Sequence, residues 1–253
     1  MKQAVIVIAV TAAVAAGSVC SAARIISINK DEQSGRVPMS PDDLAGAPGV
    51  RVSNWNNYQS ATATLNGTDL VYDDGTTVGG TFQVTTDGHP HWAGPTDDIN
   101  DPLMYTGAHA LMSDVSQGGT LSITFTDVPF PLYDIYVYAM GQSANIRGGA
   151  ITLVGGETFY TTGSSTPADD GSGYIAMTTT SFTDPGDIET GNYIAYKGLS
   201  GDQEIEATCY LWGDHPRFQV YGYQIVEVPE PQTLALFALA GAVACRRRRR
   251  ARM

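Results

Sequence analysis

The sequence predicts an all-β protein whose central region is a two-sheet antiparallel jelly-roll sandwich. Two observations predict this fold class. The middle of the chain is rich in Thr, Gly, Tyr, Asp and Val, and turn residues interrupt it roughly every 8 to 15 positions. No stretch there has the apolar spacing of an amphipathic helix. We expect helices at the two ends only: an N-terminal signal helix and a short C-terminal transmembrane helix.

The first 23 residues have the composition of a secretory signal peptide. Lys2 precedes a run of small and apolar residues from Ala4 to Gly17, and more small residues follow at Ser21, Ala22 and Ala23. A cationic start, an apolar core and small side chains at the exit are the features that export and signal cleavage require. We therefore expect residues 1–23 to be removed. The alternative is a retained N-terminal membrane anchor.

The region that follows contains eleven segments with the pattern of β-strands. In LSITF and DIYVYA, large apolar residues alternate with others, as expected where one face of a strand is buried. Gly155 and Gly156 predict a hairpin turn, because a two-residue turn needs positive φ angles. Segments 30–62 and 87–102 have the composition of loop insertions. The expected strands are Arg24–Asn29, Ala63–Tyr72, Thr81–Thr86, Leu121–Asp127, Tyr133–Met140, Ala150–Val154, Glu157–Thr161, Tyr174–Phe182, Tyr193–Leu199, Glu204–Trp212 and Phe218–Val226.

Residues 24–226 are strongly acidic and are numerous enough for one β-sandwich domain. Seven of the 14 Lys and Arg residues lie in the terminal segments, whereas 24 of the 26 acidic residues lie in this region, whose net charge is −17. Such a surface repels nucleic acid and anionic lipid, which proteins bind through Lys and Arg. Only one of the three cysteines, Cys209, lies here, so we expect no internal disulfide and a buried, packing cysteine.

The C-terminal segment combines an apolar run with a block of cations. The run Leu234 to Cys245 has no polar side chain and would span about 18 Å as a helix, against a hydrocarbon core of about 30 Å. Cations that flank a membrane segment keep that end in the cytoplasm. They predict a membrane stop, and the adjoining apolar run argues against a nucleic-acid patch. The cations are Arg246, Arg247, Arg248, Arg249 and Arg250.

The order of these features resembles the PEP-CTERM sorting signal. Pro229, Glu230 and Pro231 stand before the apolar run, and the arginine block follows it. The resemblance implies an exported bacterial protein held transiently in the inner membrane. It also implies cleavage near Pro-Glu-Pro by an exosortase-type membrane protease, then placement at the cell surface or outside the cell. The expected domains are a signal peptide at 1–23, a β-sandwich at 24–226 and the sorting signal at 227–253.

The motifs of the middle region resemble galactose-binding-like and malectin-like jelly rolls. The motifs, in chain order, are SNWNN, YDIYVYA, ITLVGGETFY, GNYIAYKGLSG and FQVYGYQIVEV. The resemblance implies the fold rather than the ligand, because β-sandwiches host many functions. The aromatic rings of Trp55 and Trp92 could stack on sugar rings, and Asn54 and Asn56 lie beside Trp55. These four residues are the candidate ligand-binding residues.

Few residues of the sequence match known metal sites or catalytic motifs. His89 and His91 form an H-x-H pair, but the additional His and Glu of the cupin pattern are not near them. Asp97–Asp101, and Asp184 with Asp187 and Glu189, supply the oxygen atoms that calcium prefers, without EF-hand spacing. We expect no cofactor except, as an open alternative, a structural calcium ion. No G-x-S-x-G, P-loop, H-E-x-x-H or G-x-G-x-x-G motif occurs, and we expect no catalytic residues.

The leading hypothesis is an exported, non-catalytic β-sandwich of the cell envelope or extracellular matrix with a structural or adhesive role. Its expected partners are an exosortase-type protease, transiently the inner membrane, and extracellular polysaccharide, but not nucleic acid. One alternative is a carbohydrate-binding module of the same fold, which coplanar exposed aromatic rings would favour. The other is a secreted hydrolase with an unrecognised site, which convergent carboxylates in a deep pocket would favour.

Overall fold

A computed structural model describes residues 23–30, 39–58, 63–87, 120–141, 148–162, 174–210 and 218–229. These residues contain eleven β-strands and two short 3-10 helices. The strands are β1 (Ile25–Lys30), β2 (Asn56–Tyr58), β3 (Ala63–Asn66), β4 (Gln83–Asp87), β5 (Thr120–Thr126), β6 (Tyr133–Gly141), β7 (Gly148–Leu153), β8 (Thr158–Thr161), β9 (Tyr193–Leu199), β10 (Gln203–Tyr210) and β11 (Phe218–Glu227). The 3-10 helices are η1 (Gly67–Asp69) and η2 (Pro185–Asp187).

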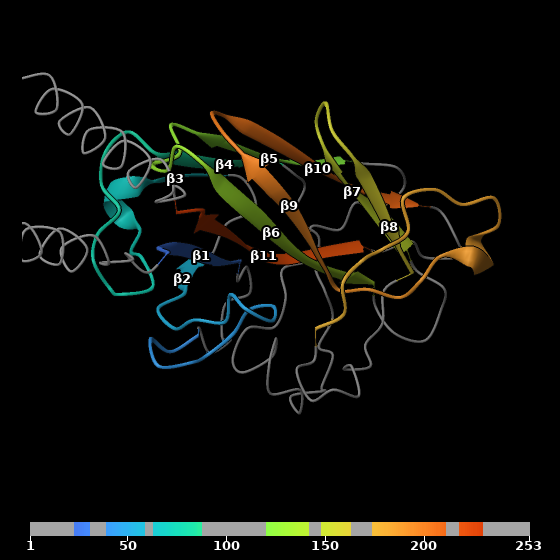
Figure 1. Ribbon diagram of the computed structural model, residues 1–253, viewed down its shortest axis with the longest axis horizontal. Helices are drawn as coiled ribbons and strands as arrows, with labels where there is room; N and C mark the ends of the chain where they lie inside the picture. Colours follow the sequence, from blue (N-terminus) through green and yellow to red (C-terminus); the bar gives the residue numbers. More distant parts are fainter. Residues whose placement is uncertain are drawn as a thin grey trace, which may run out of the picture. The chain divides into compact units, whose positions relative to one another are not determined.

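The strands form two sheets that pack face to face as a β-sandwich (Figure 1). The five-stranded sheet has the order β2-β1-β11-β6-β9, and the six-stranded sheet has the order β3-β4-β5-β10-β7-β8. All neighbouring strands are antiparallel except β1 and β2, which are parallel. The predicted two-sheet β-sandwich is therefore confirmed, with one parallel edge pair in place of a wholly antiparallel arrangement.

The main core lies between the two sheets and follows from the alternation of the strands. On β6, Tyr133, Ile135 and Val137 are buried in this core, while the intervening side chains point to the other face. Across the core, the ring of Phe125 on β5 meets that of Tyr223 on β11 edge to face, with 5.3 Å between ring centroids. Burial of these apolar side chains removes a large area from water, which is the main force that holds the sheets together.

A second hydrophobic cluster covers the outer face of the five-stranded sheet. It joins side chains of β1, β6 and β11 to the loop segment 39–55, which runs along this side of the sheet (Figure 1). Sheets buried on both faces need apolar residues at successive positions, and β1 meets this need with Ile25, Ile26 and Ile28. We call this second group the outer cluster; its buried members are Ile25, Met39, Ala45, Ala47, Val50, Trp55, Tyr136, Tyr138, Tyr174 and Val226.

Three expected segments differ from the structure. The strand expected at Ala63–Tyr72 ends at Asn66, because Gly67 begins η1 and packs so close to the Gly79 carbonyl oxygen that a Cβ atom would lie 2.3 Å from it. The segment expected as a strand at Tyr174–Phe182 makes only two isolated bridges, Ala176 to Tyr193 and Thr179 to Tyr160. Conversely, β2 lies in a segment expected to be loop.

The contacts divide the chain into a compact unit, Arg24–Val228, and a unit of the two terminal segments, Met1–Ala23 and Pro229–Met253. All eleven strands belong to the first unit. Within the described ranges, no helix is long and apolar enough to cross a membrane. The expected signal helix and the expected transmembrane helix lie outside the described residues.

Candidate functional site

The beginning of β1 and the end of β11 meet at one corner of the five-stranded sheet. The two strands are antiparallel, with Ile25 opposite Val226. Just outside this pair, the Glu227 amide donates to the Arg24 carbonyl oxygen (2.9 Å), and the Arg24 amide donates to Oε2 of Glu227 (3.2 Å). The Val228 amide donates to the Leu132 carbonyl oxygen at 2.9 Å. The chain is thus held by the sheet up to Val228, the residue before Pro229.

Pro229 is described and exposed, whereas the remaining predicted sorting residues are outside the described ranges. These are Glu230, Pro231 and the membrane-stop arginines Arg246, Arg247, Arg248, Arg249 and Arg250. Proline has a fixed φ and no amide hydrogen, so Pro229 cannot continue the β11 ladder as a donor. The last strand that the structure describes therefore ends at Glu227, where the predicted sorting signal begins.

The predicted ligand-binding residues around Trp55 are engaged by the chain itself. Trp55 is a buried member of the outer cluster, and its Nε1 donates to the Val52 carbonyl oxygen at 3.1 Å. The Asn54 side chain donates to the Asp73 carbonyl oxygen (2.8 Å), and Asn54 has a φ of 57°, a conformation that Asn tolerates better than most residues.

Asn56 uses both ends of its side-chain amide. Its Nδ2 donates to the Ser27 and Val71 carbonyl oxygens (both 2.9 Å), and its Oδ1 accepts from the Val71 amide (2.8 Å). Asn56 therefore ties β1 and β2 to the segment that follows η1. Trp92, the fourth candidate, lies outside the described residues. Ligand binding by these four residues stays a prediction.

A buried polar network that the sequence did not single out holds the loop 45–52 against the sheet. Gln224 on β11 is fully buried, and its Nε2 donates to Ser27 Oγ (2.8 Å) and to the Val50 carbonyl oxygen (3.0 Å). The Tyr138 hydroxyl donates to Gln224 Oε1 and accepts from the Ala47 amide (2.9 Å). Burial raises the pKa of Tyr138 well above its usual value, so its phenol stays neutral. The sequence feature that could have indicated this network is Gln224 itself, a polar residue between Tyr223 and Ile225.

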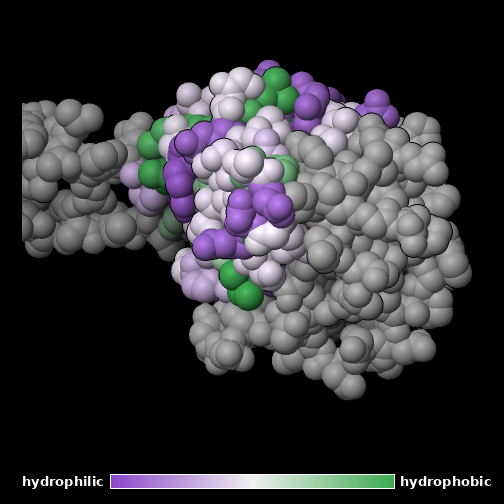
Figure 2. All heavy atoms as spheres, turned by 90° about the vertical axis from the view of Figure 1, so that its right-hand side faces the viewer, coloured by the Kyte–Doolittle hydropathy of each residue, from purple (hydrophilic) through white to green (hydrophobic). Residues whose placement is uncertain are grey.

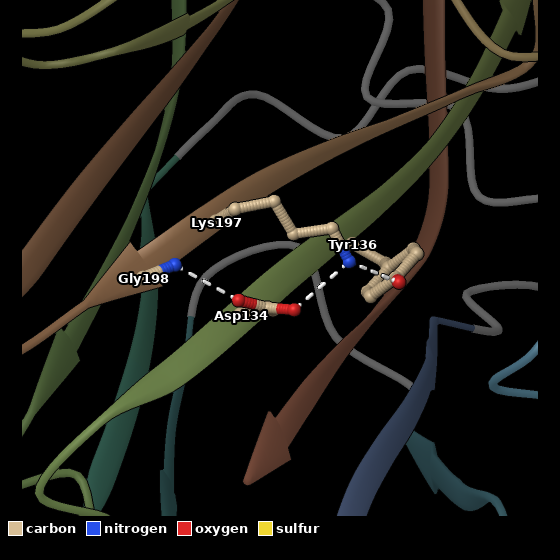
Figure 3. A network of polar contacts seen from close by, with 4 residues as sticks. All are labelled: Asp134, Tyr136, Lys197 and Gly198. Carbon is tan, nitrogen blue, oxygen red and sulfur yellow. Dashed lines mark hydrogen bonds and ion pairs between the residues drawn. The ribbon is translucent and has the colours of Figure 1, made fainter. Parts of the chain in front are cut away.

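A charged network on the outer face of the five-stranded sheet joins Lys197, Asp134 and Tyr136 (Figure 3). Lys197 Nζ lies 2.8 Å from Asp134 Oδ2, donates to the Tyr136 hydroxyl and sits 4.1 Å from the centroid of the Tyr136 ring. The other carboxylate oxygen of Asp134 accepts from the Gly198 amide at 2.9 Å. Burial lowers the pKa of Lys197, but its hydrogen bonds to Asp134 and Tyr136 outweigh this and raise it. Since the Lys197 side chain is 53% exposed, this ion pair orients side chains more than it stabilises the fold.

Carboxylate oxygen atoms of the acidic loop near η2 accept hydrogen bonds from neighbouring residues. Asp184 Oδ1 accepts from the Gly186 amide (2.8 Å), and Asp187 Oδ2 accepts from the Asp184 amide (3.3 Å). Glu189 accepts from the Thr178 hydroxyl. Within the parts of the chain that the structure describes, no three His, Cys, Asp or Glu residues converge as metal ligands. The loop at Asp97–Asp101 and the residues His89 and His91 are outside those parts, and the Cys209 side chain is not described.

The described surface is mainly hydrophilic. At the end of the sandwich seen in Figure 2, the coloured residues are mostly polar, and hydrophobic ones form only small spots. Among the described residues, the large hydrophobic side chains that are exposed are Leu44 (52%) and Val154 (47%). Since both faces of the five-stranded sheet carry a buried cluster, its described strands leave little apolar surface for a partner.

Comparison with known proteins identifies the segment that leaves this corner. Residues 227–250 match the family model of the PEP-CTERM protein-sorting motif. Neither a curated protein nor a solved structure matches the chain. The chain is thus an exported β-sandwich protein whose C-terminal motif directs it through the membrane to exosortase processing. The resemblance to galactose-binding-like and malectin-like jelly rolls stays a prediction.

Proposed function

We propose that the protein is a non-catalytic structural or adhesive component of the cell surface or extracellular matrix. The observation that supports this role is the direct join between the sandwich and the sorting motif. Glu227 is both the last residue of β11 and the first residue of the motif match. A folded domain without a linker suits a building block held close to the cell surface better than it suits an enzyme that must reach a distant substrate.

The charge and surface of the domain are consistent with this role. Its 24 acidic residues against seven cations give strong mutual repulsion between copies, which favours solubility outside the cell. The two hydrophobic clusters lie inside the domain or under the loop 39–55. Contacts with partners would therefore use polar side chains, or cations that bridge the acidic surface to acidic polysaccharide.

The sorting step is tested by variants of the motif in a host that carries the matching exosortase. Glu230→Ala, or replacement of both Pro229 and Pro231, should leave membrane insertion intact but block cleavage, because the extended peptide offered to the protease is changed. Full-length protein should then accumulate in the inner membrane. Replacement of all five membrane-stop arginines by Ser should instead let the tail pass through the membrane. Fractionation and mass spectrometry of the C-terminal peptide measure both outcomes.

Glu157→Ala is the matched control, because Glu157 is an exposed acidic residue in the turn between β7 and β8. It should be sorted like the wild type. An intact wild-type tail on surface-localised protein would show that the segment is an anchor instead.

The structural or adhesive role is tested on cells that export the wild type or Glu230→Ala. Loss of cell attachment or of matrix cohesion in the variant supports the proposal, and unchanged attachment contradicts it. A glycan array with the purified domain separates a carbohydrate-binding module from a structural protein. Release of sugar or peptide products by the domain would indicate the hydrolase instead.

A further inference from the structure

The corner where β1 begins holds Arg24, the residue that follows the predicted signal peptide. The guanidinium carbon of Arg24 lies 3.3 Å from the centroid of the Tyr72 ring, and its Nη2 donates to Thr76 Oγ1 at 3.0 Å. The next amide, of Ile25, donates to Asp73 Oδ1 at 2.9 Å. Three separate side chains of the segment 72–76 thus hold the two residues that follow Ala23.

The amide nitrogen of Arg24 is itself directed at a carboxylate. It lies 3.2 Å from Oε2 of Glu227, and both residues are partly buried. The carbonyl oxygen of Arg24 accepts from the Glu227 amide at 2.9 Å, which fixes the two backbones in register. The nitrogen that donates this hydrogen bond to the carboxylate is the one that signal cleavage after Ala23 would release.

We propose that cleavage after Ala23 delivers the α-ammonium group of Arg24 to a preformed site on Glu227, and that the ion pair stabilises the mature domain. Hydrolysis of the Ala23–Arg24 peptide bond consumes one water molecule and gives the Ala23 carboxylate and the Arg24 amine, which takes up a proton at neutral pH. A neutral amide donor is then replaced by a cation with three donors. Charge-assisted hydrogen bonds of this kind are about twice as strong as neutral ones.

This inference rests on the export and signal cleavage on which the proposed function also depends. It adds a link between the two ends of the chain. Glu227 is the first residue of the sorting motif match and lies two residues before Pro229. The product of N-terminal processing therefore fixes the strand end from which C-terminal processing starts.

The test uses the compact unit Arg24–Val228, which contains both hydrophobic clusters and all eleven strands. Urea unfolding is measured for protein with a free Arg24 amine and with an acetylated one, each in the wild type and in Glu227→Gln. Acetylation should lower the folding equilibrium constant about two- to fivefold in the wild type. It should change the constant less than about 1.5-fold in Glu227→Gln, which keeps an acceptor oxygen but not the charge.

Glu157→Gln is the matched control for lost negative charge. Acetylation should lower its folding equilibrium constant by the same factor as in the wild type. Equal effects of acetylation in the wild type and in Glu227→Gln would overturn the proposal. A second readout is the acylation rate of the Arg24 amine at neutral pH, which should be several-fold faster in Glu227→Gln. Equal rates would also count against the proposal.

N-terminal sequencing of the exported protein separates this inference from the proposed function. A mature chain that begins at any residue other than Arg24 overturns the inference. The fate of the C-terminal tail in the same sample tests sorting independently.

Discussion

Gln224 is a fully buried side chain whose amide is used at both ends. A buried polar group costs free energy unless its hydrogen bonds are complete, so its surroundings must be arranged around it. Here the arrangement joins Ser27 on β1, Tyr138 on β6 and the Val50 carbonyl oxygen of the covering loop. One side chain therefore specifies where the loop 45–52 docks, which purely apolar packing would leave less defined.

We expect Gln224→Leu to lower the free energy of unfolding by about 2–3 kcal/mol. Leucine fits the apolar cluster but leaves the Val50 carbonyl oxygen and the Ser27 hydroxyl without their donor, at about 1–3 kcal/mol for each buried group. Gln83→Leu is the control, because Gln83 is an exposed glutamine of β4 bonded only to Asn66 Oδ1 among the contacts described for it. It should change stability by less than about 0.5 kcal/mol. Equal losses in urea unfolding of the two variants would contradict the importance of the network.

At the scale of elements, alternation in the sequence was enough to place most strands. The expected Tyr133–Met140 and Tyr193–Leu199 correspond closely to β6 and β9. The strand β2 was missed because its three residues, Asn56–Tyr58, carry side chains typical of loops and pair with β1 only through the fold. The segment Tyr174–Phe182 has strand-like residues but lacks a continuous partner. Pairing of distant segments is not encoded in local pattern.

The candidate site was predictable only where it depends on contiguous residues. The sorting motif is contiguous, so its order and composition identify it without a structure. The burial of Trp55 in the outer cluster was not predictable, because tryptophan suits both a core and a sugar-binding surface. The approach of Arg24 to Glu227 depends on a pairing between residues 203 positions apart.

Strand β7 packs closely against β11 of the other sheet at Gly149, which has no side chain. A Cβ atom at Gly149 would lie 2.2 Å from Cγ of the fully buried Phe218 ring. We expect Gly149→Ala to destabilise the domain by about 1–3 kcal/mol, because the ring has no free space to move into. Urea unfolding of Gly149→Ala, Phe218→Leu and the double variant checks this. The double variant should lose less stability than the two single losses added together, and simple additivity would contradict the contact.

At the scale of the whole molecule, burial of tyrosine makes the fold sensitive to alkali. Burial raises the pKa of Tyr133 to about 12, against the lowering effect of a hydrogen bond with Gln203. Burial also raises the pKa values of Tyr138, Tyr196 and Tyr223. These residues come from both clusters, so the same titration acts on both faces of the five-stranded sheet.

We expect stability to be constant from neutral pH to about pH 9 and to fall steadily between about pH 9 and 12. The folded-state pKa values are raised, so the unfolded chain loses its phenolic protons at lower pH than the folded one, and alkali favours unfolding. Urea unfolding at a series of pH values measures the fall. Phenolate absorbance should show the buried tyrosines ionising together with unfolding. Ionisation of all tyrosines near pH 10 in protein that remains folded would contradict the burial.

The attachment of the sorting motif to β11 also decides how the domain would meet mechanical force. β11 lies between β1 and β6; it pairs with β6 along its length and with β1 over residues 222–226. Tension that enters at Val228 and runs along the strand would pull on both ladders in shear, so their hydrogen bonds would have to break together. A strand at the edge of the sheet would offer one ladder only. A protein held by its C-terminus in moving water would thus be pulled at one of its most resistant strands.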